Sequence, residues 1–203
     1  EAMAQAIFKE WFIDFGGHDD FVSTRIGPLP RGWRVGSIAD VSTNVRDSVD
    51  PTDLPVSTAY VGLEHIPRRR ATLETWGSAA DVDSGKSRFK RGDTLFGKLR
   101  PYFHKVVPAF MDGICSTDVL IVRPQSESWR WFTFGHLFSD GMVAHATSTS
   151  DGTRMPRAKW SDLARYEIAI PPSDVAADFE STVTPLFSRM NMSQVESRLL
   201  ADL

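Results

Sequence analysis

Apolar residues near the start of the chain recur at helical spacing. Ala4, Phe8, Trp11 and Phe15 are separated by four, three and four positions, so they share one face of a helix. The two glycines that follow, at positions 16 and 17, are typical of a helix end. The sequence therefore predicts an amphipathic helix over residues 1–15.

A second helical pattern runs from Ser173 to Leu203. Its apolar stripe includes Leu186, Met190 and Leu199, with a small slip in phase. Pro185 predicts a kink or a late helix start, because proline lacks the backbone donor of a helix interior. The two terminal helices could pair as an antiparallel coiled coil or fold onto the core between them, and the residues leave both possibilities open.

Between these helices, residues 27–172 show short apolar runs broken by glycine, proline, aspartate and serine, which is typical of strands and turns. Two helical segments, Ser128–Phe138 and Ser161–Ala164, and two polar loops, 44–55 and 79–87, interrupt the runs. The predicted strands are Trp33–Val35, Ala59–Leu63, Thr94–Phe96, Val106–Phe110, Val119–Arg123 and Tyr166–Ile170.

Composition places the chain among soluble globular proteins, with 203 residues, 41% of them hydrophobic and 24% charged. No apolar run approaches the roughly 20 residues of a membrane helix, and the amphipathic start is unlike a signal peptide. The single cysteine, Cys115, excludes an internal disulfide and favours a cytoplasmic location. Because the chain begins at Glu1, within a predicted helix, we expect a fragment or a processed chain.

The net charge of −3 hides an asymmetry. Residues 61–160 contain 15 Lys and Arg against 10 Asp and Glu, a balance of +5, whereas the rest contains 8 against 16, a balance of −8. A basic centre between acidic ends is expected of a DNA-reading domain joined to protein-binding segments. A solvated mixed surface would explain the charge equally well.

Cations and aromatic residues are interleaved from Lys86 to Lys105, a combination that suits a phosphate backbone and exposed bases. Arg100 and Tyr102 are expected to contact bases, since a guanidinium can bond to guanine at two atoms; a structural ion pair is the alternative for Arg100. The turn at Lys90–Asp93 is interpreted as a solvated hairpin tip. The residues expected to contact phosphates here are Lys86, Arg88, Lys98 and Lys105.

Residues 147–159 form a second candidate DNA-binding segment, rich in hydroxyl groups and with Gly152 to permit close backbone approach. Its candidates are Ser150, Arg154, Arg157 and Lys159; a surface loop without function is the alternative. A third candidate region holds Asn44 and Arg46, together with the arginine run 68–70, of which at most two side chains can face one way on a strand.

Catalytic patterns are not evident. No lysine follows an acidic residue at the offset of a carboxylate nuclease, Gly85-Lys86-Ser87 lacks the rest of a phosphate-binding loop, and Pro171-Pro172 follows Ile170 where an amino-methyltransferase has Asn or Asp. The histidines have no zinc spacing with Cys115, which is expected to be a buried, inert thiol. No metal or catalytic site is predicted.

A set of phrases along the chain resembles one family. AQAIFKEWFIDF (residues 4–15), LPRGWRVGSIADV (29–41), YVGLEHI (60–66), GKSRFKRGDTLFGKLRPYFHKV (85–106), GICSTDVLIVRP (113–124) and STSDGTRMPRAKWSDLARYEIAIPP (148–172) resemble, in order and spacing, a recognition domain of type I restriction–modification specificity subunits. The resemblance implies an α+β fold, with a mixed α/β target recognition domain (27–172) between conserved helices (1–17 and 173–203) that form an antiparallel coiled-coil-like spacer.

The resemblance also implies a function. Such a subunit has no catalysis of its own and reads double-stranded DNA, usually with two recognition domains, each for one half of a split target. Methyltransferase (M) and restriction (R) subunits assemble around it, and S-adenosylmethionine is expected on the M subunit, with no cofactor on this chain. With one such domain, the chain is expected to be half a subunit, or to pair with a second half or copy.

Six residues are expected to pack the spacer and help dock the M subunits: Phe8, Trp11, Phe15, Leu186, Met190 and Leu199. Two alternative functions stay open. One is the recognition portion of a fused restriction–methylation enzyme. The other is a module whose basic face binds an acidic protein.

Overall fold

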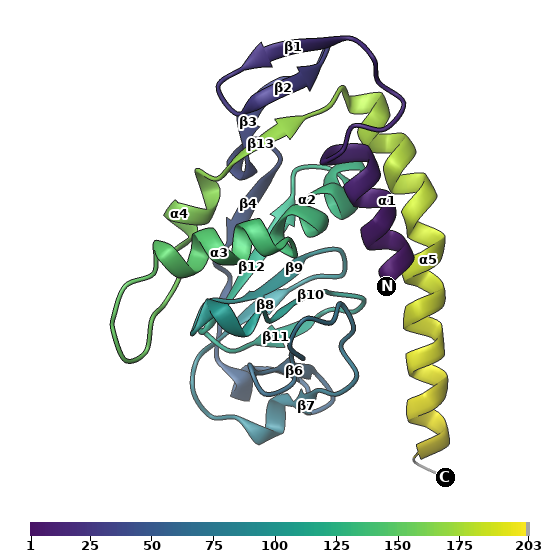
Figure 1. The fold of residues 1–203 in the computed structure, drawn as a ribbon. Coiled ribbons are helices and arrows are strands. Elements are labelled where there is room, and N and C mark those ends of the chain that lie inside the picture. The colour runs from purple at the N-terminus through teal and green to yellow at the C-terminus, as the bar shows by residue number, and fades with distance from the viewer. Residues whose placement is uncertain (202–203) are drawn as a thin grey trace.

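The computed structural model describes residues 1–201, apart from the side chains of most residues after Ser193. Figure 1 shows two stacked sheets beside a layer of helices, with the long C-terminal helix α5 (Ser173–Ala201) along one side. The shorter helices are α1 (Ala2–Phe12), α2 (Arg130–Leu137), α3 (Asp140–Ser148) and α4 (Trp160–Ala164).

The centre of the molecule is an antiparallel sheet in the order β10 (Val106–Pro108), β9 (Thr94–Gly97), β12 (Val119–Pro124), β4 (Ser42–Val45). β12 reads as a continuous apolar run because both faces of this sheet are covered. Leu120 and Val122 belong to the core cluster that contains the helices, whereas Val119 and Ile121 belong to a cluster with the second sheet. The alternation of side chains along one strand thus joins two hydrophobic layers.

The second sheet has the order β5 (Ser48–Val49), β8 (Lys86–Phe89), β11 (Gly113–Cys115), β6 (Ala59–Val61), β7 (Gly77–Ser78). β11 pairs parallel with β6 and antiparallel with β8. Cys115 and Phe89 face the central sheet, while Ile114 faces the opposite side, towards Val49 and Ala79. Two further pairs complete the strands: β1 (Phe21–Thr24) with β2 (Gly27–Pro30), and β3 (Arg34–Ser37) with β13 (Glu167–Ile170).

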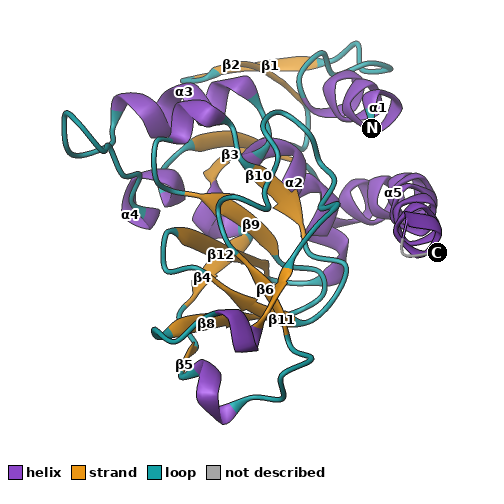
Figure 2. Cartoon of the chain, turned by 90° about the horizontal axis from the view of Figure 1, so that it is seen from below, coloured by secondary structure: helices purple, strands orange, loops and turns teal. Residues whose placement is uncertain are grey.

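Both terminal helices pack on the helical layer rather than standing apart from it. Phe12 lies 4.7 Å from Phe179 of α5 and 4.8 Å from Phe132 of α2, between ring centroids. Further along α5, Phe187 stacks on Trp131 at 3.9 Å. Figure 2 shows α1 and α5 on the same side of the molecule, next to α2.

The mixed α+β class is confirmed, but the details of the terminal helices were partly wrong. α1 ends at Phe12, three residues earlier than expected, and the long α5 runs through Pro185, which excludes a late start. The structure does not show the expected coiled-coil spacer: within the described residues, α1 is short and its aromatic face is used in the core.

All six predicted strands are present, with ends shifted by one or two residues. The polar loop predicted at 44–55 was partly wrong, because it holds the end of β4, all of β5 and a 3-10 turn. The segment predicted as a loop from 147 begins inside α3, which the sequence pattern missed. Missed as well were β1, β2, β7, β8 and β11.

Candidate nucleic-acid interface

The two cationic segments that the sequence predicted separately lie side by side. The Arg100 amide donates to the Pro156 carbonyl at 2.7 Å, and the Ala158 amide donates to the Lys98 carbonyl at 2.9 Å. Leu99 and Arg157 form a bridge between these two bonds. The backbone therefore joins two segments almost sixty residues apart in sequence into one surface.

The loop of residues 149–159 is itself a hairpin. Asp151 and Arg157 exchange backbone hydrogen bonds of 3.2 and 2.9 Å, and Gly152 takes a φ of 93°, which favours glycine. Figure 1 shows this hairpin projecting between α3 and α4, away from the sheets. Arg154 and Met155 are exposed on it, and among the described residues Arg154 makes no ion pair.

Two cations of the hairpin are held by carboxylates. Arg157 Nε donates to Asp118 Oδ1 at 3.1 Å, and Asp118 also accepts the Lys98 amide through its carbonyl. Lys159 pairs with Asp151, which raises the pKa of the lysine by hydrogen bonding and charge attraction. Asp118 orients both segments, and no motif in the sequence singled it out.

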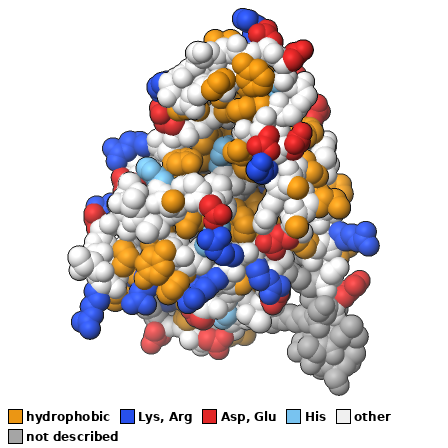
Figure 3. All heavy atoms as spheres, in the orientation of Figure 1, with side chains coloured by type: hydrophobic (Ala, Val, Ile, Leu, Met, Phe, Trp, Pro, Cys, Tyr) orange, Lys and Arg blue, Asp and Glu red, His pale blue; other side chains and the backbone are white. Residues whose placement is uncertain are grey.

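Next to this hairpin, the 3-10 turn η4 (Pro101–Phe103) lies between two left-handed residues, Arg100 and His104. Tyr102 is exposed on the turn. The Arg68 guanidinium lies over the Phe103 ring at 3.9 Å. Figure 3, which has the orientation of Figure 1, shows a group of hydrophobic side chains at the lower left of the molecule with lysine and arginine side chains around it. Arg68 and Phe103 were not expected to act as a pair, since 35 positions separate them.

Two predicted phosphate contacts point elsewhere in this structure. Lys86 is 6% exposed, and its ammonium donates to the Ser84 carbonyl at 2.5 Å and to the Ser84 hydroxyl at 2.7 Å. The Lys105 ammonium donates to the Leu63 carbonyl, and partial burial lowers its pKa. Both lysines therefore fasten loops to the sheets and are not free on the surface.

The third candidate region lies at the sheet edges. Arg46 and Arg88 are exposed, and the Arg88 amide donates to the Asp47 carbonyl at 2.8 Å, which brings their segments together. Asn44 is half-buried on β4, with its Oδ1 buried and without a partner among the described atoms.

The arginine run is largely occupied by internal contacts. Arg69 Nη1 donates to Asp140 Oδ1 at 2.9 Å, and Arg70 pairs with Glu74. Of the three, Arg68 has its charge free of carboxylates within the described residues. Arg68 is thus the arginine of this run without an ion pair in the described part of the chain, which is within the limit of two set by strand geometry.

The Lys90–Asp93 turn is only partly the solvated tip that was expected, because Lys90 and Arg91 are exposed but Asp93 is not. Asp93 is 1% exposed and accepts the Lys90 amide and the Arg123 guanidinium. The turn is anchored in the core by this carboxylate.

Of the residues expected to pack the helices, those with described side chains lie in or against the helical core, except Phe15, which follows the end of α1. Phe8 and Trp11 lie 6.1 and 5.7 Å from Phe179, Phe15 lies 5.3 Å from Trp33, and Leu186 and Met190 are half-buried against the same cluster. The side chain of Leu199 lies outside the described residues. Their docking of M subunits stays a prediction.

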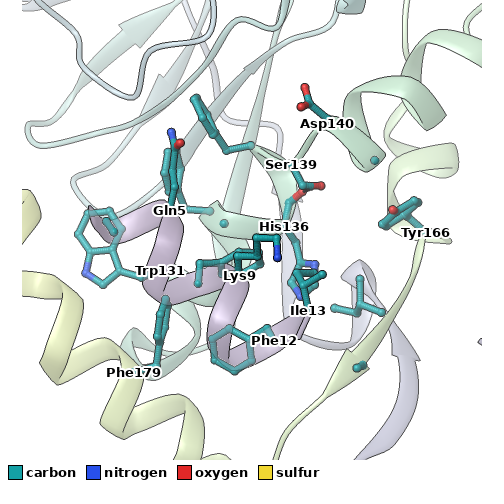
Figure 4. A pocket seen from close by; sticks show the side chains of 18 of the residues that line it. Gln5, Lys9, Phe12, Ile13, Trp131, His136, Ser139, Asp140, Tyr166 and Phe179 are labelled. Carbon is teal, nitrogen blue, oxygen red and sulfur yellow. Dashed lines mark hydrogen bonds between the residues drawn. The ribbon is translucent and has the colours of Figure 1, made fainter. Parts of the chain in front are cut away.

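A cavity of about 870 Å³ lies between α1, α2, α5 and β13. Figure 4 shows Trp131 and Phe179 at one side of it and Tyr166 and Asp140 at the other. Burial lowers the pKa of His136, in its wall, to about 3, so this imidazole is uncharged near neutral pH. The cavity is mainly apolar and does not suit a phosphate chain.

The described side chains were also compared with the requirements of a catalytic nucleophile and of a metal site. Cys115 is buried as predicted, and burial raises its thiol pKa to about 12, so it is a poor nucleophile. Among the described residues there is no group of three His, Cys, Asp or Glu placed to hold a metal. No described helix is long and apolar enough to cross a membrane.

Comparison with solved structures assigns the fold. The HsdS subunit from Thermoanaerobacter tengcongensis superposes with a TM-score of 0.65 and 24% identity, covering 89% of this chain and 48% of that one. A chain of a type I R-M system, solved for its complex assembly and conformational transition, gives 0.64 and 23%, covering 86% and 46%. The fold is therefore that of a subunit of type I restriction–modification systems.

Curated relatives narrow this class, although no protein-family model matches the chain. The EcoDI specificity subunit of Escherichia coli is 24% identical over 180 residues, 83% of this chain and 38% of the relative. The MjaIX specificity subunit of Methanocaldococcus jannaschii is 23% identical over 214 residues, 98% of this chain and 49% of the relative. The chain is a homologue of type I restriction–modification specificity subunits and spans about half the length of the relatives it matches, which confirms the resemblance.

Proposed function

We propose that this chain reads DNA sequence as one half of the specificity subunit of a type I restriction–modification complex. Residues 27–172 act as its target recognition domain and read one part of a bipartite target. Residues 1–17 and 173–203 belong to the helical spacer. Homology to specificity subunits over about half their length supports this division.

The observation that carries the proposal is the backbone ladder between residues 98–100 and 156–158. It brings together the segments that carry the half-buried Arg100 and the exposed Tyr102 and Arg154. Sequence readout needs two kinds of group close together: cations that hold the DNA backbone, and side chains that reach the edges of the bases. Arg46 and Arg88 would extend the contact along the phosphates.

The chain acts without catalysis and without a cofactor of its own. M subunits supply S-adenosylmethionine and methylate adenine after flipping it out of the helix, and R subunits cut the DNA. A second recognition half, or a second copy of this chain, reads the rest of the target. All of this takes place in the cytoplasm.

The test is selection from a randomised duplex pool, with and without the M subunit, at about 50 and 200 mM salt. A short fixed motif whose enrichment increases with the M subunit is the expected result. Binding that is salt-sensitive but unselective would contradict sequence reading by this half. Absence of DNA binding under all four conditions, with retention of an acidic protein, would favour an interaction module instead.

A further inference from the structure

The turn η4 is held rigidly at both ends. Arg100 and His104 adopt φ values of 51° and 53°, which non-glycine residues rarely take. Arg100 is fixed by its amide bond to Pro156, and the Phe103 and His104 amides donate to the Arg100 and Pro101 carbonyls at 2.9 and 2.8 Å. His104 is buried, and its Nε2 lies 2.8 Å from the Phe138 carbonyl. The turn is therefore preorganised and cannot easily withdraw.

This fixed turn presents an aromatic ring to solvent. Tyr102 is 48% exposed, although it meets Phe103 edge to face at 4.8 Å between centroids. The Arg68 guanidinium covers a face of the Phe103 ring, with its central carbon 3.9 Å from the ring centroid. One side of the tyrosine is thus supported, while the rest of the ring is open. Exposed apolar rings on rigid backbone often mark a binding surface.

The charge around the ring indicates what it meets. Arg68 lies over the neighbouring Phe103 ring, Arg100 directly precedes the turn, and neither makes an ion pair among the described residues. The hairpin with the exposed Arg154 is tied to the same turn through Pro156. An apolar ring within a cationic rim suits a nucleic acid, since bases offer apolar faces between phosphates.

We propose that Tyr102 is a stacking wedge, whose ring inserts at one partly unstacked base step of bound duplex DNA while Arg68 holds a flanking phosphate. The proposal rests on the proposed function and adds to it a deformation of the target. Apolar side chains that enter between base pairs kink the duplex, and pyrimidine–purine steps unstack most easily. Tyr102 therefore contributes specificity through the flexibility of one step.

The experiment uses the duplex that the unchanged protein selects, with 2-aminopurine placed in turn at each purine position. We expect its fluorescence to rise on binding at one step, because unstacking relieves quenching. Tyr102→Phe should keep the rise, since stacking needs the ring and not the hydroxyl. Tyr102→Ala should abolish the rise and weaken binding roughly tenfold or more, on the scale of one lost base–aromatic stack. Met3→Ala, 64% exposed on α1 and outside the candidate DNA-binding segments, is the matched control and should keep the rise.

Two results would overturn the wedge. An undiminished rise in Tyr102→Ala would show that another group unstacks the step. Equal losses in Tyr102→Phe and Tyr102→Ala would show that the hydroxyl, bonded to phosphate, is the contact. If the unchanged protein selects no duplex, the proposed function fails first; if it selects one and no position brightens, only the wedge fails.

Discussion

Arg123 donates two hydrogen bonds to Asp93, from Nε to Oδ1 at 2.7 Å and from Nη2 to Oδ2 at 2.8 Å. The pair links the turn before β9 to the end of β12, two central neighbours in the four-stranded sheet. Asp93 Oδ2 also accepts the Lys90 amide at 2.7 Å. One buried carboxylate thus closes the turn and clamps it to the sheet that carries the recognition loops.

Asp93→Ala should lower the free energy of unfolding by about 3 kcal/mol, because it leaves Arg123 and the Lys90 amide without their partner. Urea unfolding followed by circular dichroism measures this loss. Asp112→Ala is the control: its exposed carboxylate accepts only the Arg91 amide at 2.8 Å, so we expect a loss of about 1 kcal/mol or less. Equal losses for the two variants would contradict the clamp.

Phe179 fixes α5 to the rest of the molecule, since its buried ring meets Phe8, Trp11 and Phe12. Phe179→Ala should cost about 3–5 kcal/mol through lost burial and the cavity that remains. Thermal unfolding would report it as a large fall in Tm. Met192→Ala, 58% exposed on the same helix, should change Tm little; a similar fall there would mean that the distal helix, not the aromatic cluster, sets stability.

Stability should depend on pH through buried histidines. Burial lowers the pKa of His136 to about 3 from 6.5, and that of His104 in the same direction. Below pH 6.5 the unfolded chain binds protons that the folded chain does not, so this contribution to stability is complete above pH 6.5 and is lost as pH falls. The slope is at most about 1.4 kcal/mol per pH unit for each histidine.

Urea unfolding between about pH 5 and 6.5 measures that slope, within a window above the titration of ordinary carboxylates. His136→Gln should flatten it, because the variant has no proton to gain on unfolding. An unaltered slope in His136→Gln would show that the imidazole is already solvated in the folded state.

Arg154→Ala should weaken binding to all duplexes alike and reduce the slope of log K against log salt by about 0.9, as expected for one lost phosphate contact. Fluorescence anisotropy over a salt series gives both quantities. Lys9→Ala, which removes an exposed cation of α1 paired with Asp14, should alter neither. An effect confined to the selected sequence would instead make Arg154 a base reader.

Arg100 tests base readout more directly. Its positive φ would strain alanine, so we choose Arg100→Asn, since asparagine tolerates the left-handed region. The variant should lose about 1–3 kcal/mol of binding to the selected duplex and much less to unrelated DNA. Equal losses on both, measured in the same competition assay, would reassign Arg100 to the phosphate backbone or to holding Pro156.

Among the strands found from the sequence, Val119–Arg123 has an apolar run that is buried on two faces. The missed ones, including β5 and β8, are short, and polar residues such as Ser48 and Arg88 interrupt them. Lys86 shows the same limit for the site: its spacing indicated a surface cation, but the local strand turns it inward, where Ser84 receives it. Charge patterns identify candidates and do not give the direction in which a side chain points.

Contacts between residues far apart in the sequence were the second feature that could not be predicted. Helical spacing predicted that Phe8 lies on an apolar face, but it left open whether this face meets the C-terminal helix or the core; in the structure Phe8 meets both Phe179 of α5 and His136 of α2. Likewise, residues 98–100 and 156–158 were each recognised as DNA-binding candidates, but their union depends on amide and carbonyl groups that every residue shares. Asp118, which serves both segments, lies within the phrase GICSTDVLIVRP, but its partner Arg157 is 39 positions away and could not be predicted.

That union has an evolutionary consequence. The bonds from Arg100 to Pro156 and from Ala158 to Lys98 use main-chain atoms alone, so they survive replacement of the side chains that point outward. New target sequences can then be explored by exchanging residues 149–157 while the geometry of the reader is inherited unchanged. The hairpin is in this sense an interchangeable cassette, and libraries randomised only at its exposed positions are the natural starting point for retargeting this protein.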